Sequence, residues 1–202
     1  MRVLIASGGT GGHIFPAVSV MEEIRNRTSD AQFLFMGSTN KALQGLGLIK
    51  NSRMVHLPAV RMPGLGVQDL ESFAFRMALS FGQSVRRIGL FRPHVALGFG
   101  SFCTLAPLLA AKALGTPVAV HEANAVPGKA NLLLSHLSDR VLVHFRQTAD
   151  YFPRHVRKIV KVVGMPVRKE FTESRNRLGA LAQLKLSGTR FTLLVAGGSQ
   201  GA

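Results

Sequence analysis

Short apolar runs separated by segments of helical periodicity constrain the fold of this chain more than any other feature. Eight such runs occur, at residues 3–6, 32–36, 54–57, 95–99, 117–121, 141–144, 159–163 and 191–196. Alternation of this kind is typical of βαβ units, which build a mostly parallel sheet with helices on both faces. The sequence therefore predicts an α/β, Rossmann-like fold whose ligands bind at the carboxyl ends of the strands.

Glycines cluster where several of these strands are expected to end. The first cluster, Ser-Gly-Gly-Thr-Gly-Gly-His at 7–13, follows the first apolar run and precedes a segment with Pro16 in the predicted first turn of a helix. Bare backbone lets a ligand approach closely, and a helix N-terminus attracts an anion. The stretch indicates a phosphate-binding loop in which His13 is placed to take a proton. A tight turn without a ligand is the alternative.

The charge balance indicates anionic partners. Lys and Arg number 25 against 10 Asp and Glu, a formal net charge of +15, and a positive surface attracts anions. Nucleic acid is disfavoured, because the chain has one Tyr, no Trp and no basic strand interleaved with aromatic residues. The single cysteine, Cys103, supports neither a disulfide framework nor a zinc site. A pyrophosphate-bearing substrate or an anionic membrane surface fits better than nucleic acid, and a merely solvating charge is the alternative.

The sequence indicates neither a membrane-spanning or secreted protein nor a dinucleotide-dependent enzyme. The longest apolar stretches are too short to span a bilayer, and the N-terminus lacks the pattern of a secretory signal. A dinucleotide-dependent oxidoreductase or epimerase would carry an acidic residue at the end of the second strand, to bind ribose hydroxyls. Residues 36–39 are Met-Gly-Ser-Thr instead. A cytosolic protein with a different ligand is therefore expected.

Four motifs in order resemble the MurG family of bacterial glycosyltransferases. They are Gly-Gly-Thr-Gly-Gly-His at 8–13, His-Glu-Ala-Asn-Ala-Val-Pro-Gly-Lys-Ala-Asn at 121–131, Val-Val-Gly-Met-Pro-Val-Arg at 162–168 and Gly-Gly-Ser-Gln-Gly-Ala at 197–202. The resemblance covers essentially the whole chain. It implies the GT-B arrangement of two Rossmann-like domains, with residues 1–165 as the N-terminal acceptor- and membrane-side domain. Residues 166–202 would be a linker and the first strand and loop of a truncated donor-binding domain.

The activity that the resemblance implies belongs to peptidoglycan synthesis, and hence to cell-wall biogenesis, cell shape and cell division. N-acetylglucosamine (GlcNAc) would pass from UDP-GlcNAc to undecaprenyl-pyrophosphoryl-MurNAc-pentapeptide, converting lipid I to lipid II, with inversion and without a metal or cofactor. The enzyme would be peripheral on the cytoplasmic face of the bacterial inner membrane. Because the donor domain holds much of the donor, we expect this chain alone to be inactive. A non-catalytic module that binds lipid pyrophosphate or a membrane surface is the alternative.

The resemblance also implies roles for individual residues. His13 matches a proposed general base for the acceptor hydroxyl, and Thr10, Gly11 and Gly12 match positions that line the cleft near the donor. Three further residues match positions that contact UDP-GlcNAc, namely Asn124, Arg168 and Ser199. From the residues alone, Asn124 could equally form a turn and Arg168 could be a surface charge. His121 and Glu122 are not expected to be catalytic and could equally be buried partners of neighbouring loops.

Two positions depart from the family pattern. The second glycine loop reads Gly-Ser-Phe-Cys at 100–103, where the family usually has Gly-Gly-Tyr, and Ala123 stands where glutamine is frequent. The missing tyrosine hydroxyl affects the expected contacts to the acceptor.

A membrane contact is expected on the amphipathic segment at 67–95. Phe73, Met77 and Phe81 recur at helical spacing, and Arg86 and Arg87 lie close by in the sequence. In the family, an apolar patch with a basic rim on this domain is thought to dock on the inner leaflet. Ordinary packing of these residues against the sheet is the alternative.

Overall fold

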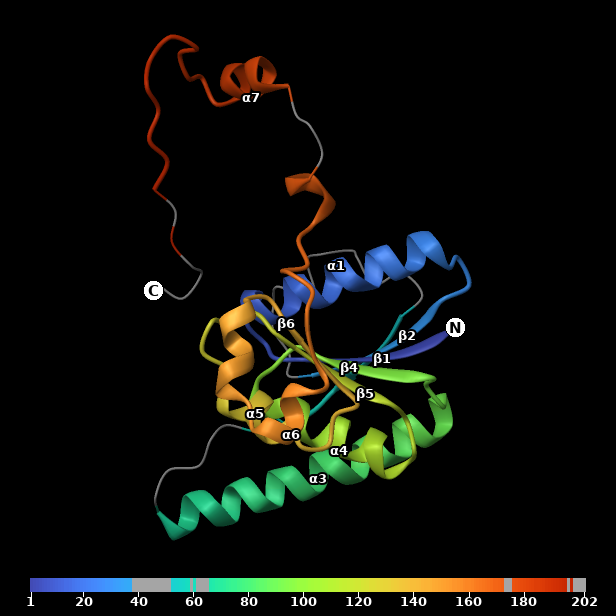
Figure 1. Cartoon of the computed structure of the whole chain (residues 1–202). Helices are drawn as coiled ribbons and strands as arrows, with labels where there is room; N and C mark the ends of the chain where they lie inside the picture. Colours follow the sequence, from blue (N-terminus) through green and yellow to red (C-terminus); the bar gives the residue numbers. More distant parts are fainter. Residues whose placement is uncertain (38–51, 59, 61–65, 173–175, 196, 198–202) are drawn as a thin grey trace. The chain divides into compact units, whose positions relative to one another are not determined.

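The computed structural model describes residues 1–37, 52–58, 60, 66–172, 176–195 and 197. The chain forms two compact units, Met1–Pro166 and Val167–Ala202 (Figure 1). The strands of the first unit are β1 Arg2–Ser7, β2 Gln32–Gly37, β3 Ser52–His56, β4 Val95–Gly98, β5 Val118–Glu122, β6 Arg140–Val143 and β7 Val160–Val162. Its helices are α1 Gly11–Arg27, α3 Val67–Phe91, α4 Leu105–Ala113, α5 Lys129–Ser135 and α6 Arg154–Arg157, with 3₁₀ turns η1 Phe102–Thr104 and η2 Arg146–Tyr151.

All seven strands form one parallel sheet in the order β3-β2-β1-β4-β5-β6-β7. Seven of the eight apolar runs are thus confirmed as strands, and the predicted fold class is confirmed. The strand order reverses at the centre of the sheet, since β2 and β3 lie on one side of β1 while β4 to β7 lie on the other. Such a reversal leaves a crevice outside the carboxyl ends of the two central strands.

Each face of the sheet is covered by helices, and alternate residues of each strand point to opposite faces. In β1, Val3 and Ile5 pack into a cluster with apolar residues of α1, whereas Leu4 and Ala6 pack into a larger cluster that includes residues of α3, α4 and α5. Figure 1 shows α1 on one face of the sheet, with α3 and α4 on the other. The two cores hold β1 and β4 rigidly at the centre, where the loops after them begin.

The eighth predicted strand is wrong. Residues 191–195 form no strand, and Phe191 and Val195 are 91% and 84% exposed. A β-strand is stable only when a neighbouring strand satisfies its backbone, and no strand of the described residues pairs with this run. The second unit contains η3 Lys169–Phe171 and α7 Arg177–Gln183. Asn176 caps α7, because its Oδ1 accepts hydrogen bonds from the N–H groups of Leu178 and Gly179.

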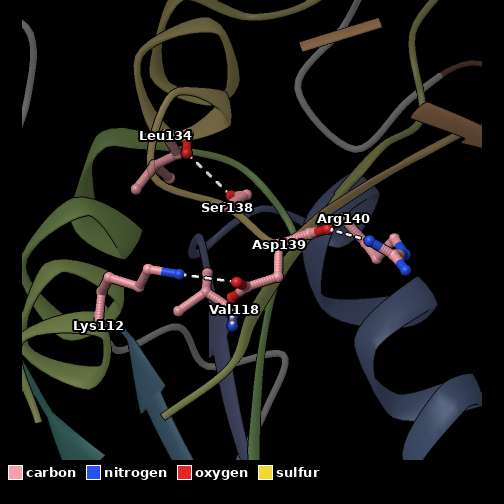
Figure 2. A network of polar contacts seen from close by, with 6 residues as sticks. All are labelled: Lys112, Val118, Leu134, Ser138, Asp139 and Arg140. Atoms are coloured by element: carbon pink, nitrogen blue, oxygen red, sulfur yellow. Dashed lines mark hydrogen bonds and ion pairs between the residues drawn. The ribbon is translucent and has the colours of Figure 1, made fainter. Parts of the chain in front are cut away.

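Asp139 connects α4 to the start of β5, as Figure 2 shows. Its Oδ1 lies 2.8 Å from Nζ of Lys112, and its Oδ2 accepts a 2.8 Å hydrogen bond from the N–H of Val118. The bond with Lys112, followed by that with Val118, lowers the pKa of the Asp139 carboxyl. None of the helices in the described part of the chain is long and apolar enough to cross a bilayer.

Replacing Asp139 by alanine should lower the free energy of unfolding by about 1–2 kcal/mol at pH 7. The ion pair is exposed and contributes little, but the N–H of buried Val118 loses its partner. Since the folded pKa is lowered, the ionic part of this stabilisation is present above the unfolded pKa and is lost as pH falls through the folded pKa. Urea unfolding of both proteins at pH 7 and pH 3 should therefore show a smaller difference at pH 3. Asp30→Ala, which removes an exposed pair with the N-terminal amine, is the control with little effect.

Candidate active site

Two glycine loops meet at the crevice where the strand order reverses. β1 and β4 are adjacent and parallel, with Ala6 opposite Gly98, and the N–H of Phe99 donates a 2.9 Å hydrogen bond to the carbonyl of Ala6. The loop at 8–10 and the loop at 99–101 therefore leave the sheet side by side.

The glycines in these loops permit a contact that side chains would block. A Cβ atom at Gly8 would lie 2.6 Å from Cβ of Ser101. A Cβ at Gly100 would lie 3.2 Å from Nε2 of His13, and Gly100 has a φ of +82° that favours glycine. Both glycines are therefore needed to bring the second loop against the first loop and its histidine.

The first loop is shorter than predicted, because α1 already begins at Gly11. Pro16 consequently lies beyond the first turn and not within it, and it lacks an N–H for the carbonyl of Gly12. Thr10 precedes the helix but does not cap it with its side chain. Instead, its Oγ1 lies 2.8 Å from Nδ1 of His13. If Oγ1 accepts from Nδ1–H, Nε2 on the Gly100 side carries the lone pair of a neutral imidazole.

A cavity of about 190 Å³ opens between the two loops and the segment after β5. It lies wholly within the first unit. Its walls combine glycine backbone, two histidines, a carboxylate and two amides, which suits a ligand rich in hydrogen-bonding groups. The lining residues are Gly12, His13, Pro16, Phe99, Gly100, Ser101, His121, Glu122, Ala123, Asn124, Gly128, Ala130 and Asn131.

The imidazole of His13 is neutral rather than cationic in this setting. Burial lowers the pKa of its imidazole, and the negative charge of Glu122 opposes that effect to a smaller extent. The side chain is therefore largely neutral near pH 7, as proton abstraction requires.

Glu122 organises the segment that closes the cavity. It is 3% exposed, and its Oε1 accepts hydrogen bonds from N and Nδ2 of Asn124, at 2.9 and 3.0 Å. Its Oε2 accepts 2.9 Å bonds from N of Gly128 and Nδ2 of Asn131. Four donors thus fold residues 122–131 around a buried carboxylate, which is the buried-partner role that the sequence left open.

His121 and Asn131 are fixed in the same wall. Nε2 of His121 lies 3.1 Å from the carbonyl of Gly164, and burial is the main cause that lowers its pKa. Nδ2 of Asn131 also donates to the carbonyl of His121, at 3.1 Å. Its Oδ1 is buried and has no hydrogen-bond partner among the described residues, an arrangement that costs about 1–3 kcal/mol. Asn131 was not assigned a role from the sequence, although it ends the second motif.

The structure brings only some of the predicted site residues together. Gly12, His13 and Asn124 line the cavity, whereas Thr10 acts on it through His13 and Gly11 begins the helix beside it. Ser199 lies outside the described residues.

Arg168 belongs to the second unit. There it precedes η3, and its guanidinium lies 5.1 Å from the centroid of the Phe171 ring.

Helix α3 divides its apolar residues between two faces. Met77 packs against the core and lies on the same face as buried Ser80, Ser84 and Ile88, at spacings of three and four residues. Phe73 is half-buried. Of the residues expected to meet the membrane, Met77 is thus engaged in packing against the core.

The opposite face of α3 exposes Phe75, Leu79 and Leu90, with exposures of 66%, 45% and 72%. Phe81 is 37% exposed, and Arg86 and Arg87 are exposed as well. The sequence located the helix correctly but selected the stripe that partly serves the core, because burial by α4 cannot be read from periodicity alone.

Replacing Gly100 by alanine should disturb His13 as well as the backbone. A residue with Cβ at this φ costs about 1–2 kcal/mol, and the new Cβ would press on the imidazole. Gly115→Ala is the matched control, since Gly115 has a φ of +75° and no atom of the described part of the chain lies within 4 Å of its Cβ position. Both variants should lose similar stability in urea unfolding. Only Gly100→Ala should move the ring-proton resonances of His13 in NMR spectra, and equal spectra for the two variants would contradict this placement.

Comparison with known proteins agrees with the fold and with the motifs. Residues 3–143 match the glycosyltransferase family 28 N-terminal domain. The chain is 37% identical over 207 aligned residues to the UDP-N-acetylglucosamine--N-acetylmuramyl-(pentapeptide) pyrophosphoryl-undecaprenol N-acetylglucosamine transferase of Protochlamydia amoebophila, with 100% of this chain and 52% of the relative covered. It thus spans about half the length of the curated relatives it matches.

Solved structures show the same fold at lower identity. Acinetobacter baumannii MurG superposes with a TM-score of 0.63 at 23% identity, covering 88% of this chain and 47% of that one. The UDP-GlcNAc 2-epimerase of Methanocaldococcus jannaschii gives 0.61 at 18% identity, covering 82% and 46%. The fold is therefore shared by transferases and epimerases.

Among the described residues, no three His, Cys, Asp or Glu side chains are grouped as metal ligands.

Proposed function

The chain belongs to glycosyltransferase family 28 through its N-terminal domain, and on this basis we propose that it is the acceptor-side part of an enzyme that makes lipid II. The complete enzyme transfers GlcNAc from UDP-GlcNAc to undecaprenyl-pyrophosphoryl-MurNAc-pentapeptide. The observation that carries this proposal is the cavity in which a half-buried, largely neutral His13 lies between two glycine loops at the sheet reversal.

The chemistry is a direct displacement at the anomeric carbon of GlcNAc. The acceptor hydroxyl oxygen forms the new bond to that carbon, while the bond to the UDP oxygen breaks and UDP leaves with the electron pair, inverting the configuration. Nε2 of His13 accepts the hydroxyl proton, and Thr10 orients the ring through Nδ1. General-base catalysis of this kind supplies about 10²–10⁴ in rate.

Anionic groups of the substrates are met by backbone and by arginine. The 17-residue helix α1 directs its N-terminus, with Gly11 and Gly12 in its first turn, to the edge of the cavity, and this end favours a phosphate. Asn124, Arg168 and Ser199 are proposed to contact UDP-GlcNAc, Arg168 by pairing with a phosphate through its planar guanidinium. The remaining donor contacts are assigned to a donor-binding domain beginning within residues 166–202.

The acceptor carries a polyprenyl tail, so the enzyme is proposed to act as a peripheral protein at the cytoplasmic face of the bacterial inner membrane. The support is helix α3, which exposes Phe75, Leu79 and Phe81 beside Arg86 and Arg87. Each basic residue near an anionic surface contributes about 1 kcal/mol of attraction. Met77 anchors the helix from its packed side, and half-buried Phe73 is proposed to contribute to the membrane contact.

A transfer assay tests the proposal. Residues 1–202, joined in frame to the donor half of the Protochlamydia relative, should transfer labelled GlcNAc from UDP-GlcNAc to the lipid-linked acceptor, and no labelled lipid should form when the acceptor is omitted. Binding of the acceptor without transfer would instead favour a lipid-pyrophosphate binding module. Conversion of UDP-GlcNAc to an isomer without any acceptor would place the chain with the epimerases that share its fold.

A further inference from the structure

The carboxylate in the cavity wall is unusual in how its charge is accommodated. Glu122 is buried at the end of β5, and the four donors around it are neutral amides, two from Asn124 and one each from Gly128 and Asn131. No ion pair among the described side chains includes Glu122. Neutral amide donors do not cancel the net negative charge of a carboxylate.

That charge acts on His13. Both side chains line the same small cavity, and Glu122 is the charged group whose field raises the pKa of His13 against the larger effect of burial. Within the described residues, the other titratable side chains next to this wall include His121 on β5, His144 after β6, exposed Lys129 at the start of α5 and the buried thiol of Cys103 on η1. Burial lowers the pKa of His121, so it adds little positive charge near pH 7.

We propose that Glu122 is a positioning residue for the base: its carboxylate shapes the loop that walls the cavity and stabilises the positive charge that His13 gains when it takes the acceptor proton. The inference rests on the proposed function, which gives His13 that task. In a site shielded from water, a fixed negative charge interacts more strongly with a developing imidazolium than it would in solvent. Glu122 does not touch the reacting atoms in this account.

NMR titration of the full 202-residue chain tests the charge effect without any need for activity. The ring protons of His13 are assigned by comparison with His13→Gln. In Glu122→Gln the midpoint of the His13 titration should fall by about 0.5–1 pH unit, because the opposite charge is gone. Glu122→Asp, which keeps the charge, should restore most of the midpoint.

Asn131→Ala is the matched control for loosening of the loop. It removes one amide donor to the carboxylate but leaves the charge, so the His13 midpoint should stay close to that of the unchanged chain. The proposal is overturned if Glu122→Gln leaves the midpoint unchanged, or if Asn131→Ala lowers it equally. Should Glu122→Gln fail to fold, Glu122→Asp decides: its carboxylate is withdrawn by one methylene, so a small fall is expected and a rise refutes the proposal.

The outcome separates this inference from the proposed function. In residues 1–202 joined to the donor half of the Protochlamydia relative, Glu122→Gln should move the acid limb of the pH–rate profile to lower pH, because the pKa of His13 falls. If Glu122→Gln shifts the His13 midpoint but the joined protein without substitutions transfers no GlcNAc, the proposed function fails and the electrostatic coupling of Glu122 to His13 stands. Normal transfer with an unshifted midpoint would remove only the role of Glu122.

Discussion

His13→Ala, introduced into residues 1–202 joined to the donor half of the Protochlamydia relative, should slow GlcNAc transfer about 10²–10⁴-fold, because the acceptor hydroxyl loses its base. The loss should appear in kcat, with little change in acceptor affinity, since the backbone of the glycine loops is intact. Single-turnover transfer of labelled GlcNAc to the lipid-linked acceptor measures the effect directly.

The pH profile and a second histidine sharpen this test. The unchanged enzyme should lose activity as pH falls through the pKa of His13, which burial places below about 6.5, because an imidazolium cannot accept the proton. His136→Ala is the control. His136 is exposed, directly follows α5, and its Nδ1 lies 3.1 Å from Nε2 of His155. A His13→Ala enzyme that retains more than a tenth of the rate would require a different base.

Gly37→Ala should destabilise the fold by about 2–3 kcal/mol, the second large effect that we expect. Gly37 pairs with Ser7 in the β1–β2 ladder, and a Cβ at this position would overlap the backbone carbonyl of Ser7. A backbone atom cannot rotate away as a side chain can, so β1 and β2 must separate locally, at the cost typical of overpacking. The midpoint of urea unfolding measures the loss.

Gly82→Ala is a matched control with the opposite sign. Gly82 lies within α3, and nothing approaches its Cβ position within 4 Å. Alanine is the better helix former, so this variant should gain about 0.5–1 kcal/mol. Equal effects of the two substitutions would mean that β1 and β2 are not packed as described.

The fold was predictable because its signals are local and repeated. Each buried strand is a short apolar run. The glycines that follow β1 and β4 mark the two loops at the point where the strand order reverses. Parallel strands place all these loops at one edge, so His13 and the Gly100 loop could be expected to be neighbours. The run at 191–196 has the same local signal, but pairing depends on a neighbouring strand, which a local pattern does not report.

The site was predictable in position but not in detail. Periodicity cannot show that four amide donors converge on Glu122, because the segment 122–131 has no regular pattern until it folds around that carboxylate. The same holds for Thr10, whose residue type suggests an N-cap while its hydroxyl contacts His13 instead. In α3, the choice between the core face and the exposed face depends on contacts with α4 that are distant in sequence.

Binding of the acceptor beside His13, between the two glycine loops, can be followed through amide chemical shifts. The 202-residue chain is titrated with a soluble acceptor, MurNAc-pentapeptide diphosphate carrying a short prenyl chain. We expect the largest shifts on Gly11, Gly12, His13, Gly100 and Ser101. Saturable shifts confined to the opposite edge of the sheet, around Arg53 and Arg92, with these five amides unmoved, would contradict it.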